Sequence, residues 1–175
     1  MELGRRRPRS EPDQKMSCMK PILALVLSLM AVPTLALDSI GTVTARLEGA
    51  DLSWQVLTTD DGAAMVQVNN IGPLTMVDTH AMGDGDAYIG LIFQDEPSID
   101  VAPVGITIDI RPEGAAGTVW TSAGASVAPT LSIERLNLDG AGRIEAGFEA
   151  MLCHSDTPAR CETVIGRIDT DLGLP

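Results

Sequence analysis

The chain has 175 residues, of which 45% are hydrophobic and 21% are charged, and its formal net charge is −12. Residues 37–175 contain six arginines, no lysine and 21 acidic residues, which gives this part a formal charge of −15. Such a surface repels phosphate groups, so we exclude nucleic acid and anionic lipid headgroups as partners. The sequence does not identify the partner or the oligomeric state.

The first 36 residues have the order of a secretory signal peptide. Six basic residues precede an apolar run at 22–32, and Thr34 and Ala36 occupy the small-residue positions of a cleavage site. As a helix the run covers only ~17 Å, too short for a membrane span. We therefore predict an N-terminal signal helix that is removed on export to the periplasm or the cell exterior, leaving no membrane span. Met16 and Met19 are alternative starts.

Residues 37–175 have the length of a single domain and the pattern of an all-β protein. No window keeps apolar residues at helical spacing for ten positions, whereas short alternating runs recur between turn residues. The sequence therefore predicts an antiparallel β-sandwich or a small barrel, with long loops at 94–104 and 112–129. The turn residues after 53–59 also predict a hairpin with 64–70. The expected strands are 42–49, 53–59, 64–70, 72–79, 86–94, 105–112, 119–121, 130–138, 143–153 and 161–172.

Cys153 and Cys161 are the only cysteines after residue 36. The apolar residues of both flanking strands alternate, which directs both thiols to the opposite, outer face. In an exported protein this pair predicts a structural disulfide, which stabilises by roughly 2–3 kcal/mol. A redox site would have the C-x-x-C spacing, and a zinc site would need two more ligands, such as His154 and the distant His80.

Pairing the two cysteines also sets the register of a final hairpin over residues 143–172. This register places Phe148 opposite Gly166, where the ring can cover bare backbone, and Arg143 opposite Asp171. A slip by one residue would turn the apolar faces of both strands to solvent. We expect the cysteine Cα atoms to lie about 5.5 Å apart.

The segment 76–86 is the most suggestive functional candidate. Met76, His80 and Met82 combine two thioethers with an imidazole, which suit Cu(I), and their even spacing places them on one face of a strand. The H-x-M pair is similar to an element of the bacterial periplasmic copper chaperones, which are small β-sandwiches. The rest of that family's motif of spaced Met and His residues is absent. The alternative is that the methionines fill the core beside a solvated histidine.

Four aspartates in turn segments are a second metal candidate. Asp60, Asp61, Asp84 and Asp86 offer carboxylates of the kind that bind calcium in extracellular modules. The stretch "DGDAYIG" lacks the third oxygen ligand and the central glycine of an EF-hand loop. Asp-Gly pairs are also ordinary turn sequences, which is the alternative interpretation.

The sequence contains no recognisable catalytic motif. Neither His80 nor His154 accompanies a G-x-S-x-G elbow, and no Gly-rich phosphate loop joins a strand to a helix. We predict an exported β-domain with a non-catalytic binding or structural role and no cofactor. The first alternative is a periplasmic copper- or calcium-binding protein, and the weaker alternative is a hydrolase whose site the sequence does not locate.

Overall fold

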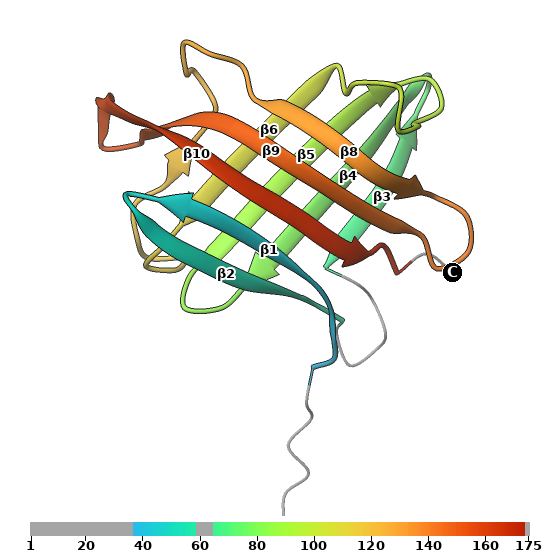
Figure 1. The fold of residues 1–175 in the computed structure, drawn as a ribbon, viewed down its shortest axis with the longest axis horizontal. Coiled ribbons are helices and arrows are strands. Elements are labelled where there is room, and N and C mark those ends of the chain that lie inside the picture. Colours follow the sequence, from blue (N-terminus) through green and yellow to red (C-terminus); the bar gives the residue numbers. More distant parts are fainter. Residues whose placement is uncertain (1–36, 59–64, 174–175) are drawn as a thin grey trace, which may run out of the picture. The chain divides into compact units, whose positions relative to one another are not determined.

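The computed structural model describes residues 37–58 and 65–173, which form an all-β fold of antiparallel strands (Figure 1). The predicted signal helix lies outside these residues. Within them, no helix has the length and apolar character needed to cross a membrane. The strands are β1 (Ser39–Leu47), β2 (Ala50–Leu57), β3 (Val66–Ile71), β4 (Leu74–Met82), β5 (Asp86–Gln94), β6 (Gly105–Arg111), β7 (Trp120–Thr121), β8 (Thr130–Asn137), β9 (Arg143–His154) and β10 (Thr157–Asp171).

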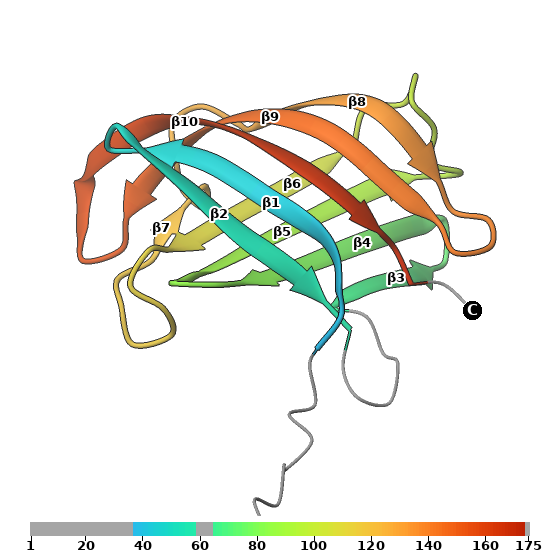
Figure 2. The ribbon, with the colours of Figure 1, turned by 60° about the horizontal axis from the view of Figure 1, so that its bottom comes forward.

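The strands form two layers that are joined by strand pairing at both sides. One layer has the order β2-β1-β10-β9-β8 and the other contains β3, β4, β5 and β6 (Figure 2). A single pair, Gln55 with Met82, joins β2 to β4, and the two residues of β7 join β6 to β9. The pairing therefore returns to its starting strand, while β3 and β8 are extra strands at the sides of β4 and β9.

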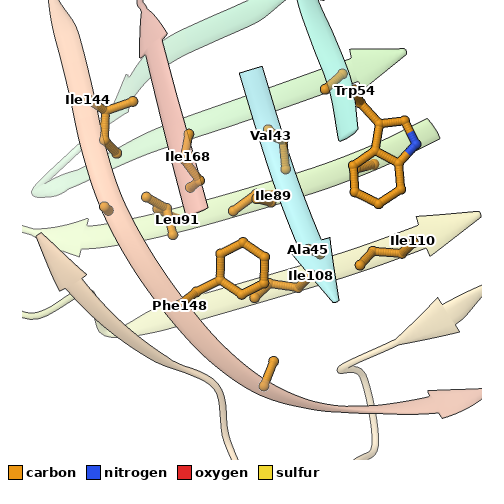
Figure 3. Packing of buried hydrophobic residues seen from close by; sticks show 14 of the residues in the cluster. Val43, Ala45, Trp54, Ile89, Leu91, Ile108, Ile110, Ile144, Phe148 and Ile168 are labelled. Atoms are coloured by element: carbon orange, nitrogen blue, oxygen red, sulfur yellow. The ribbon is translucent and has the colours of Figure 1, made fainter. Parts of the chain in front are cut away.

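One cluster of buried apolar side chains fills the space between the layers (Figure 3). Because successive strand residues point to opposite faces, the alternating pattern of the sequence directs one apolar set inward from each strand. Trp54, Phe93 and Phe148 are among the buried side chains, together with many aliphatic residues. The edge strand β8 contributes only half-buried residues, such as Leu131 and Ile133. The alternation and the predicted strand positions are thus confirmed.

The final hairpin has the predicted register. Cys161 is opposite Cys153, Gly166 is opposite Phe148, and Asp171 is opposite Arg143. The disulfide is present, with a Cα–Cα separation of 4.0 Å instead of the expected value of about 5.5 Å. The shorter separation follows from the direct cross-strand pairing, because close antiparallel pairs have Cα atoms about 4.5 Å apart.

The turn of the hairpin predicted between residues 53–59 and 64–70 lies outside the described residues. β3 pairs with β4, through a tight turn in which Gly72 has a φ of 61°. The residue before β3 bonds to β2, because Met65 N donates a backbone hydrogen bond of 2.8 Å to Leu57 O. β2 therefore contacts β4 at one pair only, and β3 extends the other layer.

The outer face of β9 and β10 carries a network of ion pairs. Glu145 lies opposite Asp169, and Arg143 offsets this like-charge pair by contacting both. Arg143 also donates a hydrogen bond of 2.6 Å to Asp171. The hydrogen bond from Arg143 holds the pKa of Glu145 below its usual value. Arg167, which is 3.7 Å from Glu145, is a second neighbouring cation.

Gly166 provides a test of the register. A Cβ atom at Gly166 would overlap the Phe148 ring and the carbonyl oxygen of Thr44, whereas a Cβ at Gly147 would have its nearest neighbour 3.9 Å away. We expect Gly166→Ala to lower the free energy of unfolding by roughly 2–3 kcal/mol, or to prevent folding, because overpacking forces the backbone to move. The matched variant Gly147→Ala should be neutral or stabilising by up to about 1 kcal/mol. Urea denaturation measures both, and equal effects would contradict the register.

Candidate functional site

A pocket of about 400 Å³ lies on the outer face of the layer that contains β4, β5 and β6. We call this pocket the outer groove. Its lining combines thioether, aromatic and small apolar groups with a few charged side chains. The lining residues are Met65, His80, Ala81, Met82, Asp86, Ala87, Tyr88, Asp109 and Arg111.

The first row of the outer groove crosses four neighbouring chain segments. His80 on β4 pairs with Tyr88 on β5, and Tyr88 pairs with Asp109 on β6. Met65, just before β3, accepts a backbone hydrogen bond of 2.8 Å from His80. Cross-strand partners point to the same face of a sheet, so His80, Tyr88 and Asp109 form a continuous line, and Met65 lines the pocket beside it.

The second row lies one pleat further along the same strands. Met82 pairs with Asp86, and Asp86 pairs with Arg111. Between the two rows lie Ala81 and Ala87, whose side chains are buried. Because these two side chains point inward, the sheet backbone forms the floor of the outer groove.

Tyr88 is a fixed wall of the outer groove. Its hydroxyl donates a hydrogen bond of 2.6 Å to Asp78, and its ring centroid lies 4.9 Å from that of His80. The hydroxyl also lies over Gly90, where an added Cβ would be 2.5 Å from it. Burial, followed by the hydrogen bond and the charge of Asp78, raises the pKa of Tyr88 to about 12. The phenol is therefore protonated at neutral pH.

The outer groove has an excess of negative charge. Asp86 forms an ion pair of 2.8 Å with Arg111, which balances one carboxylate. Asp109 accepts a hydrogen bond from Thr121, and Asp78 accepts the one from Tyr88. Neutral hydroxyl donors do not cancel a carboxylate charge, so the surroundings of His80 attract cations.

Of the three predicted metal ligands, two line the outer groove and one does not. Met76, His80 and Met82 all lie on the outer face of β4, where Met82 is 51% exposed and Met76 is half-buried. Only His80 and Met82 line the outer groove. Met76 is four residues from His80, about 13 Å along a strand, and Asp78 lies between them on the same face. The cross-strand neighbours of Met76 are Asn69 and Ile92.

Met65 is a candidate ligand that the sequence analysis missed. The alternation of Val66 and Val68 on the inner side does indicate that Met65 faces outward. Its position beside His80, however, depends on the pairing of β3 with β4, which the pattern of residues 53–70 did not predict.

Within the part of the chain that the structure describes, the remaining metal and redox candidates do not come together in one site. Asp86 is engaged by Arg111, and Asp60 and Asp61 lie outside the described residues. Within residues 37–58 and 65–173, no three His, Cys, Asp or Glu side chains come together as a metal-binding group. His154 packs edge-on against Trp120 at 5.2 Å beside the disulfide. Among the described atoms its buried Nδ1 has no hydrogen-bond partner.

No protein-family model, curated protein or solved structure matches this chain. A proposal for its function therefore depends on the chemistry of the outer groove.

Tyr88 can be observed directly, because it is the only tyrosine of the chain. We expect its phenol to ionise near pH 12 in the folded protein, compared with about 10 after denaturation. Since the folded pKa is the higher one, the associated stability is present below pH 10 and is lost as the pH rises toward 12. Ultraviolet absorbance of the tyrosinate measures both transitions. Asp78→Asn should lower the folded value but leave it above 10, because burial is the largest cause. A folded transition near pH 10 would contradict the packing of Tyr88.

Proposed function

We propose that the chain is an exported, non-catalytic binding domain that binds a small cationic ligand in the outer groove. The observation that supports this function is the row of Met65, His80, Tyr88 and Asp109 beside the pair of Asp86 and Arg111. Side chains from distant parts of the sequence meet there on one rigid sheet face. Binding sites built on strands hold their geometry better than sites on loops.

The size and lining of the outer groove suit a small ligand. Pockets for small molecules usually enclose about 300–1,000 Å³ and combine apolar walls with a few oriented polar groups. The value of about 400 Å³ lies in this range. The hydrogen bond to Asp78 fixes Tyr88, and the ion pair with Arg111 fixes Asp86, so the walls are organised before a ligand enters.

The charge of the outer groove supports a cation as the ligand. Asp78, Asp86 and Asp109 lie in or beside it, whereas Arg111 is the only arginine or lysine among its described lining residues. Among the lining residues that the structure describes, none is a serine, threonine, cysteine or lysine that would serve as a nucleophile. The geometry therefore supports binding better than it supports the hydrolase alternative.

Export is supported by two independent features of the chain. The N-terminal sequence has the three regions of a signal peptide, and Cys153 and Cys161 form a disulfide, a bond typical of oxidising compartments.

The export proposal predicts a processed chain. When the full chain is produced in an exporting bacterium, N-terminal sequencing of the periplasmic protein should begin at Leu37 or within two residues of it. The variant Val26→Arg interrupts the apolar run and should leave the protein unprocessed inside the cell, because export signals need that run. A periplasmic chain that retains residues 22–32 would contradict the proposal.

The binding proposal predicts that cations perturb the outer groove. Methylammonium, guanidinium, tetramethylammonium and a set of metal ions can each be titrated into the labelled protein, with acetate as the anionic control. We expect at least one cation to shift the NMR signals of His80, Met82 and Tyr88.

Two exposed apolar positions give a matched pair of variants. Met82→Lys adds a positive charge to the outer groove and should weaken cation binding by at least about tenfold through like-charge repulsion. Ile165→Lys adds the same charge at a 63% exposed residue of β10, in the other layer, and should leave binding unchanged. If no cation of the panel shifts these signals, or if both variants behave alike, the proposal is wrong.

A further inference from the structure

We infer that Met65, His80 and Met82 bind a soft monovalent metal ion, Cu(I) or Ag(I), at one end of the outer groove. This inference depends on the proposed function, since it names one class of cation that the outer groove binds. It replaces Met76, which the sequence pattern selected, by Met65 from the neighbouring segment.

The backbone brings the three donor side chains to one place. The pair of Val66 with Thr79 continues to Met65 beside His80, and the hydrogen bond of 2.8 Å from His80 N to Met65 O fixes this contact. The N–H of Met65 donates to the carbonyl oxygen of Leu57, so Met65 is bonded to both β2 and β4. Met82 follows His80 by two residues on the same face, at about 7 Å. Met65 is half-buried and also packs against the core, but it lines the same pocket as His80 and Met82. A long, flexible thioether side chain can turn from this position toward the imidazole.

The types of donor select the ion. Thioether sulfur is a soft, uncharged ligand that favours Cu(I), and imidazole is compatible with the same ion. Calcium and magnesium need several oxygen ligands. Structural zinc sites need four Cys, His or carboxylate ligands, and the described residues bring no three of these together. The set of Met65, His80 and Met82 therefore distinguishes a soft ion from the common divalent ions.

Exposure and charge favour loading of the ion. His80 is exposed and Met82 is 51% exposed, so an ion can reach both from solvent. Asp78 flanks His80 along β4, and Asp109 lies beyond Tyr88 in the same row. These carboxylates compensate the single positive charge of the ion, which neutral thioether and imidazole ligands leave uncancelled. Contact with the Tyr88 ring, at 4.9 Å between centroids, restrains the imidazole.

Ag(I), which is stable in air, is the first probe, and Cu(I) under anaerobic conditions with a competing Cu(I) chelator is the second. The full chain should carry Cys18→Ser, because cysteine sulfur is itself a ligand for either ion. With the methionine methyl groups labelled by ¹³C, one equivalent of Ag(I) should shift the signals of Met65 and Met82. The signals of Met76 and Met151 should not move.

Conservative variants separate a ligand from a packing residue. Met65→Leu and Met82→Leu keep the apolar volume but remove the sulfur, and each should weaken Ag(I) binding by about tenfold or more, equivalent to about 1.4 kcal/mol. Met76→Leu and Met151→Leu are matched controls and should bind as the parent does. Thermal unfolding of each apo variant shows whether its fold is retained.

The outcomes distinguish this inference from the proposed function. If organic cations bind in the outer groove but Ag(I) and Cu(I) do not, the metal inference is wrong and the binding function stands. If Ag(I) binds and shifts Met76 instead of Met65, or if Met65→Leu binds as tightly as the parent, the assignment of Met65 is overturned. If no cation binds at all, both proposals are wrong.

Discussion

The fold depends on the contact between the Phe148 ring and the bare backbone of Gly166. No side chain fits at Gly166, because an added Cβ would overlap both the ring and the carbonyl oxygen of Thr44 on the adjacent strand. The contact fixes the register of β9 and β10. The same register places Cys153 opposite Cys161. It also places Arg143 opposite Asp171, with which it forms an ion pair. A slip by one residue would break the aromatic contact, the disulfide geometry and the apolar inner face together.

The same size matching continues into β1. Along one cross-strand row, Phe148 is followed by Gly166 and Ala45, so one large side chain is compensated by two small positions. The next row inverts this order, because Ala146 is followed by Ile168 and Val43. Only 3% of the residues are aromatic, so close packing of aliphatic side chains has to fill the core. Figure 3 shows Phe148, Ala45 and Ile168 within this packing.

The sequence predicted the features that local alternation controls and missed those that depend on distant pairing. Each of the longer strands has one buried face, so a period of two identified them from the sequence. The hairpin of β9 and β10 was predictable because its two strands are consecutive and each carries a cysteine. The partner of β3 was not, since residues 53–59 and 72–79 alternate equally well. Met65 was missed as a candidate ligand for this reason, whereas His80 and Met82, two residues apart on β4, were recognised together.

The outer groove is distinguished by two carboxylates, Asp78 and Asp109, whose hydrogen-bond donors are uncharged hydroxyl groups. Five of the six arginines of the described strands lie on β1, β8, β9 and β10, where Arg143 alone contacts three carboxylates. The layer of β4, β5 and β6 has only Arg111, which is committed to Asp86. The strands of both layers carry the same formal charge of −2, from seven acidic residues with five arginines in one layer and three aspartates with one arginine in the other. Asp78 and Asp109 in this second layer are held by hydroxyl donors, which orient a carboxylate but leave its charge available to a cation.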